Sequence, residues 1–213
     1  MRITGGVFRS RMLRAPKGDG TRPTSDRVRE ALFSMLAAES PILGARVLDL
    51  YAGTGALAFE AISRGAVHAT LVEKNRNALT AISENITALG LEDVVRIHAT
   101  PVERVGALLD GEPFDLIFAD PPYADIPNGV VVRALEPIFL SAPLAAHARI
   151  VIEHASRDQP PVFSTSLRPA KPAKLESPAH ENPDPVGAIS LELLRQRTWG
   201  DTSIAIFGIV RAD

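Results

Sequence analysis

A short apolar segment that runs directly into a glycine-rich turn constrains this chain more than any other feature. Residues 46–55 read Arg-Val-Leu-Asp-Leu-Tyr-Ala-Gly-Thr-Gly, which predicts a strand at 47–50, a turn, and a helix over about 56–64. Gly53 and Gly55 tolerate positive φ and let a ligand approach the backbone at the positively polarised start of that helix. A strand, a glycine turn and a helix in this order are typical of nucleotide-binding α/β folds.

The rest of the chain continues this alternation. Strands are expected near 46–50, 69–73, 94–98, 114–119 and 149–153, and helices at 56–64, 75–89, 101–110 and 129–141. This order predicts an α/β fold with a doubly wound, Rossmann-like sheet. Residues 191–198 and 203–210 flank a Trp-Gly-Asp-Thr turn and predict a C-terminal hairpin. Apolar residues at helical spacing predict a further helix at 26–38, with Ser25 and Asp26 suited to its first turn.

Acidic residues at the ends of successive strands indicate which nucleotide the fold binds. Gly53, Gly55 and Ala58 formally fit the dinucleotide fingerprint, and Glu73 follows at the distance of a ribose-binding acid, so a nicotinamide enzyme is one candidate. Asp49 argues against it, because a carboxylate just before the turn repels a pyrophosphate but attracts an ammonium. S-adenosylmethionine offers an ammonium, a sulfonium and a ribose, and is the predicted cofactor.

The segment Asp120-Pro121-Pro122-Tyr123 follows the apolar run 114–119 and indicates the chemistry. Neither proline can donate a ladder hydrogen bond, and each residue before a proline is biased toward extended conformations, so the turn is stiff. It holds a carboxylate, free carbonyls and an aromatic ring in fixed directions, which suits a planar exocyclic amine on a base. Taken by itself, the motif also fits a strand terminator with Asp120 as a turn cap.

Together, the segment 49–57, Glu73 and Asp120–Tyr123 resemble the class I S-adenosylmethionine-dependent amino-methyltransferases. More narrowly, residues 2–6, 9–11, 22–33 and 199–202 are similar to the bacterial 16S ribosomal RNA guanine-N2 methyltransferases named for guanine 966. The resemblance implies methyl transfer to that amine on the small ribosomal subunit or its assembly intermediate. It also implies the site residues, catalytic Asp120, Pro121, Pro122 and Tyr123, and cofactor-binding Asp49, Tyr51, Gly53, Gly55, Glu73 and Thr100.

Two alternatives stay open on the residues. An Asp-Pro-Pro-Tyr turn also serves adenine-N6 and cytosine-N4 enzymes, so the acceptor can be another RNA, DNA or a protein. A non-catalytic RNA-binding module explains a basic N-terminus, but not acids at three successive strand ends.

Charge is distributed unevenly along the chain. The net charge is −2, yet residues 1–30 hold eight Arg and Lys against three Asp and Glu. We therefore expect residues 1–24 to form a basic RNA-binding extension, with a short hairpin at 3–13, on a methyltransferase domain at 25–213. The resemblance favours phosphate contacts by Arg9, Arg11 and Arg27, against the alternative of a solvated surface.

The composition limits which metals, cellular locations and membrane segments are expected. There is no cysteine and the five histidines lack metal-ligand spacing, so no metal is expected. No apolar segment reaches the length of a signal peptide or a membrane span, which predicts a cytoplasmic protein, and we expect a monomer. Seven prolines between Pro160 and Pro185 predict a flexible loop at about 160–190.

Overall fold

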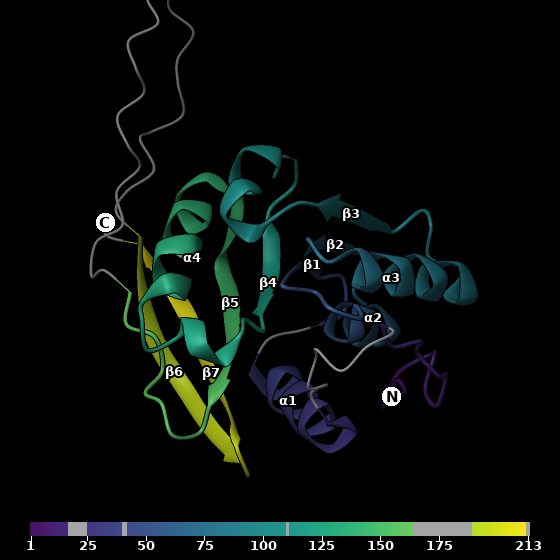
Figure 1. Ribbon diagram of the computed structural model, residues 1–213, viewed down its shortest axis with the longest axis horizontal. Helices are drawn as coiled ribbons and strands as arrows, with labels where there is room; N and C mark the ends of the chain where they lie inside the picture. Colours follow the sequence, from purple (N-terminus) through teal and green to yellow (C-terminus); the bar gives the residue numbers. More distant parts are fainter. Residues whose placement is uncertain (17–24, 40–41, 110, 164–188, 212–213) are drawn as a thin grey trace, which may run out of the picture.

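The computed structural model describes residues 1–16, 25–39, 42–109, 111–163 and 189–211 of the 213-residue chain (Figure 1). Its strands form one sheet in the order β3-β2-β1-β4-β5-β7-β6. The first five strands are parallel, whereas β7 runs antiparallel between β5 and β6. The bounds are β1 Arg46–Leu50, β2 His68–Glu73, β3 Val95–Ala99, β4 Phe114–Ala119, β5 Leu144–Ala155, β6 Ile189–Trp199 and β7 Thr202–Arg211. The predicted Rossmann-like sheet with a C-terminal hairpin is confirmed.

Helices cover both faces of the sheet because the strand side chains alternate between two apolar clusters. Helices α1 (Asp26–Glu39), α2 (Ala56–Ser63) and α3 (Arg76–Leu89) pack on one face. Helix α4 (Val130–Ser141) packs on the other. Within β1, Val47 points to the first cluster, and Leu48 and Leu50 point to the second. Burial on both faces explains why the central strands β1 and β4 read as nearly continuous apolar runs.

Side-chain caps place the helix starts where the sequence predicts them. The Ser25 hydroxyl accepts a hydrogen bond from the Val28 amide at 3.3 Å, at the start of α1. The Asn75 side chain accepts from the amides of Asn77 and Ala78 at the start of α3. That helix ends at Gly90, whose φ of 67° is left-handed.

Two predicted elements differ from the structure. The helix expected at 101–110 is wrong: two separate 3₁₀ turns, η1 (Val102–Arg104) and η2 (Gly106–Leu108), occupy this segment. Glycine weakens a helix, and a Cβ at Gly106 would crowd the Ser141 hydroxyl at the end of α4. The strand expected at 149–153 extends over Leu144–Ala155, with a register shift opposite β4. The predicted loop at about 160–190 lies mostly outside the described residues.

The N-terminal segment before α1 packs onto the main core. Arg2 and Met12 form an antiparallel bridge, in agreement with a short hairpin. Ile3 and Leu13, 1% and 5% exposed, join the apolar cluster of α1, α2 and α3. The predicted division into an extension and a domain stays a prediction.

Candidate active site

The register of the sheet aligns the predicted site residues along one edge. Leu50 pairs with both Val72 and Ala119, and Ala119 pairs with Ile152. The residues that follow these four therefore lie at the same level of the sheet, namely Tyr51, Glu73, Asp120 and Glu153. The strand order reverses between β1 and β4, and ligands of open α/β sheets bind outside the carboxyl ends of the strands at such a point.

The two glycines of the first turn meet different surroundings. Gly53 has a φ of 55°, and the nearest atom to a Cβ there would be the Tyr51 carbonyl oxygen at 3.9 Å, so this position faces open space. Gly55 has a φ of 76°, and a Cβ there would overlap the Phe59 ring and Leu71. Gly53 therefore leaves room for a ligand close to the backbone, whereas Gly55 lets α2 pack on the sheet.

The Glu73 carboxylate ties the end of β2 to this turn. Its Oε2 accepts from the Gly53 amide at 2.8 Å, and its Oε1 accepts from the amides of Lys74 and Asn75 at 2.8 and 2.7 Å. Because each carboxylate oxygen has two lone pairs, Oε2 keeps one acceptor site for a ligand hydroxyl. The open space at Gly53 and this free acceptor fit a ribose-bearing cofactor.

Asp49 lies beneath the turn. It is 1% exposed, and its Oδ2 accepts from the Ala58 amide of α2 at 3.2 Å, so it caps a helix whose Gly55 has no side chain to do so. Burial raises the pKa of this carboxyl well above its ordinary value, although the Ala58 hydrogen bond opposes the shift and Glu73 adds to it. The predicted contact of Asp49 with a ligand ammonium stays a prediction.

The turn after β4 is anchored through its tyrosine. Pro121 is buried, Pro122 is exposed, and Tyr123 opens the 3₁₀ turn η3 (Tyr123–Asp125). The Tyr123 hydroxyl donates to Glu153 Oε1 at 2.9 Å and lies 2.9 Å from Thr202 Oγ1. Burial, together with the neighbouring carboxylates, raises the pKa of Tyr123 to about 12, so the phenol stays protonated at neutral pH.

Tyr51 follows β1 in the middle of this edge, and Thr100 follows β3 at one end of it. Tyr51 is half-buried with a left-handed φ of 63°, and burial raises the pKa of its phenol. Thr100 follows Ala99, which pairs with Glu73, and its amide donates to the His98 carbonyl at 2.9 Å. A strained backbone at Tyr51 is the kind of feature that concentrates at functional sites.

The three predicted RNA-binding arginines are exposed and come from two elements. Arg9 and Arg11 belong to the N-terminal segment, and Arg27 belongs to the first turn of α1. Arg11 also donates from Nη2 to the Ala88 carbonyl of α3 at 2.9 Å, which fixes its side chain on the body of the protein. Their predicted phosphate contacts stay predictions.

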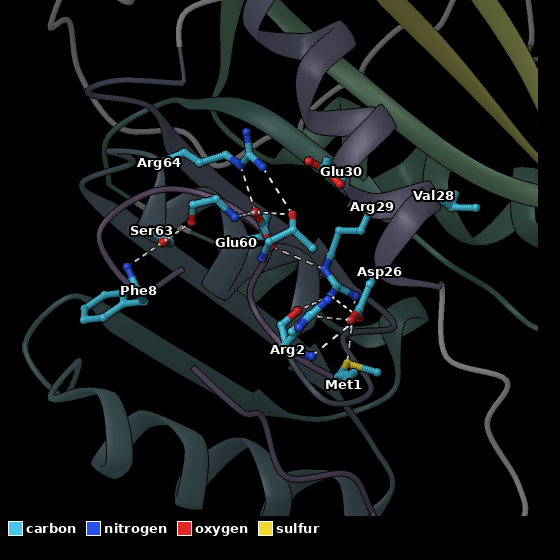
Figure 2. A network of polar contacts seen from close by, with 12 residues as sticks. Met1, Arg2, Phe8, Asp26, Val28, Arg29, Glu30, Glu60, Ser63 and Arg64 are labelled. Atoms are coloured by element: carbon cyan, nitrogen blue, oxygen red, sulfur yellow. Dashed lines mark hydrogen bonds and ion pairs between the residues drawn. The ribbon is translucent and has the colours of Figure 1, made fainter. Parts of the chain in front are cut away.

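Glu60, in the middle of α2, is fully buried and holds the N-terminal segment in place (Figure 2). Its Oε1 accepts from Thr4 Oγ1, from the Gly5 amide and from Arg64 Nε, each at 2.8 Å. Its Oε2 accepts from the Thr4 amide at 2.7 Å and from Arg29 Nε at 3.4 Å. Arg29 is itself fully buried. This network connects the N-terminal segment to the helix that begins at the glycine turn.

Two neighbouring glycines make this docking possible. The amides of Val7 and Phe8 donate to the Ser63 carbonyl and hydroxyl at 2.7 and 2.9 Å, and the Ser63 hydroxyl donates to the Gly5 carbonyl at 2.5 Å (Figure 2). Gly6 has a φ of 76°, and a Cβ there would overlap the Ser63 carbonyl. A larger residue at Gly6 would therefore lift the segment off α2.

A second link joins the N-terminal segment to the glycine turn itself. Asn85 of α3, 1% exposed, accepts from the Arg14 amide at 2.8 Å and donates to the Arg14 carbonyl at 3.1 Å. Its Nδ2 also donates to the Thr54 carbonyl at 3.2 Å. Asn85 therefore hydrogen-bonds both to the candidate RNA-binding segment and to the glycine turn of the candidate cofactor site.

Glu60, Arg29, Asn85 and Glu153 were not recognised as site residues from the sequence. A signal was present for Glu60, because the helix around it is apolar on every side and a charge there requires an internal partner. Among the described residues, no group of three or more His, Asp or Glu is placed to hold a metal ion, and no helix is long and apolar enough to cross a membrane.

Known proteins resemble this chain in sequence and in fold. The family described as Conserved hypothetical protein 95 matches residues 1–177. The ribosomal RNA small subunit methyltransferase D of Escherichia coli is 35% identical over 153 residues, which cover 72% of this chain and 74% of that protein. The putative rRNA methyltransferase YlbH of Bacillus subtilis is 30% identical and covers 97% of this chain and 98% of its own length.

A solved structure agrees with these relatives. The putative methyltransferase yhhF from Escherichia coli superposes with a TM-score of 0.75 at 29% identity, covering 100% of this chain and 99% of that one. The chain is a class I methyltransferase in fold, and it belongs to the Conserved hypothetical protein 95 family, that of the 16S ribosomal RNA methyltransferases.

Proposed function

We propose that this protein transfers a methyl group from S-adenosylmethionine to the exocyclic N2 amine of a guanine in 16S ribosomal RNA, guanine 966 by family resemblance. The observation that carries the proposal is that Glu73 and Asp120 lie level with each other at the ends of β2 and β4, the two strands that flank β1 at the switch point of the sheet. One carboxylate suits the ribose of the cofactor and the other suits the amine of the acceptor. The acceptor is the small subunit or its assembly intermediate, and the protein acts as a cytoplasmic monomer.

The cofactor end of the site is assigned to the turn after β1 and to its neighbours. Glu73 accepts from the ribose, the backbone at Gly53 and Gly55 gives close approach, and Asp49 attracts the ammonium. Tyr51 lies beside the methionine part and Thr100 accepts from the adenine amine. When bound, S-adenosylmethionine supplies an electrophilic methyl group on a cationic sulfur.

The acceptor end is assigned to the turn after β4. Asp120 and the Pro121 carbonyl accept the two hydrogens of the guanine amine, so that its nitrogen becomes more tetrahedral and presents its lone pair. Pro122 keeps the turn rigid and Tyr123 stacks on the base. Positioning contributes most of the rate, and the amine proton leaves afterward to Asp120 or to water.

The basic part of the chain is assigned to the RNA backbone. Arg9, Arg11 and Arg27 are exposed and contact phosphates, which position the RNA without reading its sequence. Placing a guanine in the active site costs less free energy when it lies in an RNA loop than when it lies in a helix, because unstacking a paired base takes a few kcal/mol.

Transfer of a labelled methyl group, followed by mapping of the product, tests this function. The acceptors are naked 16S RNA, assembly intermediates and finished small subunits, all from a strain that lacks the enzyme. We expect label in N2-methylguanosine at a single position of one of these acceptors. Label in N6-methyladenosine, in N4-methylcytidine or in a ribosomal protein would contradict the assignment and indicate another amino-methyltransferase.

A further inference from the structure

The Tyr123 hydroxyl sits in an ordered hydrogen-bond network that joins three elements. It lies 2.9 Å from Glu153 Oε1 of β5 and 2.9 Å from Thr202 Oγ1 of β7. An ionised carboxylate only accepts, so the single phenol hydrogen goes to Glu153. The Thr202 hydroxyl must then donate to the phenol oxygen. The hydroxyl hydrogens of Tyr123 and Thr202 each therefore have one assigned acceptor.

The location of Glu153 is costly for a carboxylate. The residue is 7% exposed and pairs with Ile204 of β7, and its strand neighbours Val151 and Ile152 are buried. Burying a charge among apolar side chains is unfavourable unless hydrogen bonds compensate, and an apolar residue of similar size would stabilise such a position at least as well. Apolar packing of the sheet therefore does not by itself require an acid at this position.

The register between β4 and β5 suggests why an acid occupies position 153. Ala119 pairs with Ile152, so Glu153 lies level with Asp120, one strand further along the same edge. The Tyr123 hydroxyl donates its hydrogen to Glu153 and accepts one from Thr202. These two hydrogen bonds restrict rotation of the Tyr123 ring relative to Asp120. A ring held in place before the base arrives avoids an entropic cost at the moment of reaction.

We propose that Glu153, together with Thr202, is a positioning residue for methyl transfer that holds the Tyr123 ring as the stacking surface for the acceptor base. This inference rests on the proposed function. It also assigns a role to the C-terminal hairpin, because Thr202 opens β7 and pairs with Ala155 of β5 and Trp199 of β6. The hairpin thus forms one wall of the acceptor side of the site.

A double-mutant cycle on Tyr123→Phe and Glu153→Gln tests the inference. Glu153→Gln keeps the size and one acceptor oxygen, so the fold is retained while the charge-assisted bond is lost. We expect each single variant to lower single-turnover kcat about tenfold, within the range for misplaced reacting groups, and to leave cofactor affinity unchanged. In the Tyr123→Phe background, Glu153→Gln should have no further effect, because the bond it weakens is already absent.

A matched control separates positioning from general damage to the hairpin. Ser203 is the next residue along β7, is fully buried, and its hydroxyl lies 2.7 Å from Thr198 Oγ1 of β6. Ser203→Ala should leave kcat unchanged, whereas Thr202→Val should lower it. If both variants lost the same fraction of kcat, the hairpin would have only a structural role.

A second readout does not depend on activity. Tyr123 is one of only two tyrosines, so selective ¹³Cζ labelling gives two NMR signals. The Tyr123 signal should shift in Glu153→Gln and stay in place in Ser203→Ala. An unshifted signal, or additive losses of kcat in the double-mutant cycle, would overturn the inference. Wild-type protein that methylates no small-subunit RNA would instead overturn the proposed function, and this role with it.

Discussion

Replacing Glu60 by alanine should destabilise the protein more than the loss of any single surface charge. Glu60 is fully buried, and its two oxygens accept five hydrogen bonds from Thr4, Gly5, Arg29 and Arg64. Removing it leaves the buried Arg29 guanidinium without its partner on α2 and exposes three donors of the N-terminal segment to a void. Breaking a buried ion pair from one side costs about 3–5 kcal/mol.

The lower end of that range applies here. Arg29 keeps a hydrogen bond from Nη2 to Asp26 Oδ1 at 2.8 Å and another to the Arg2 carbonyl, so its charge is still partly compensated. We therefore expect a loss of about 3 kcal/mol, which corresponds to a fall in Tm of roughly 6–12 °C for a domain of this size. Urea unfolding followed by circular dichroism measures the free energy, and a thermal scan measures Tm.

Glu84→Ala is the matched control, because Glu84 pairs with Arg14 at 3.3 Å on the surface, with side chains 47% and 70% exposed. That variant should change stability by less than about 1 kcal/mol. In Glu60→Ala the amides of Thr4 and Gly5 should also exchange faster with solvent, while the central strands stay protected. Equal stability of the two variants would refute the idea that Glu60 anchors the N-terminal segment.

Three further predictions concern the cofactor, the RNA and pH. Glu73→Ala should weaken S-adenosylmethionine binding by about 1.5–3 kcal/mol in calorimetric titration, and an unchanged affinity would remove the ribose assignment. Arg9→Ala combined with Arg11→Ala should lower RNA affinity and flatten its salt dependence by about 0.7 per lost phosphate contact, with cofactor affinity unchanged; an unaltered slope would return both arginines to solvated surface. Burial lowers the pKa of His154, so the unfolded chain takes up a proton below pH about 6.5 that the folded protein does not, and stability falls as pH decreases from there. His154→Leu should reduce this pH dependence in urea unfolding at pH 5, 6 and 7, and an identical dependence would contradict the reasoning.

The sequence was sufficient for the parts of the site that follow from local pattern. The apolar run before Gly53 and the run before Asp120 each predict a strand with a stiff or glycine-rich end, and parallel strands bring such ends to one edge. The spacing from the glycine turn likewise predicts Glu73 as the ribose-binding acid. These inferences use short-range information only, and the sheet order then places the residues side by side.

The parts that depend on contacts between distant segments were not predictable in this way. Glu153 meets Tyr123 from 30 residues away, and Thr202 meets it from 79 residues away. The sequence predicts that Gly55 contacts the cofactor, which stays a prediction, but it does not reveal that the missing side chain of Gly55 makes room for Phe59. The prediction of a helix at 101–110 was wrong because helix propensity alone does not reveal how closely Gly106 approaches the end of α4.

Single-turnover methyl transfer by Asp120→Ala, at saturating RNA and cofactor, tests most directly whether the turn after β4 is the catalytic centre. An acceptor that tightens on the amine as transfer proceeds acts on the rate more than on ground-state binding. Asp120→Ala should therefore lose about a hundredfold or more in rate, with both ligands bound nearly as before, and Asp120→Asn should retain more activity. Asp125→Ala, which removes another carboxylate from the same loop, should remain close to wild type. Near-normal turnover by a folded Asp120→Ala variant would contradict the account and leave Asp120 as a turn cap.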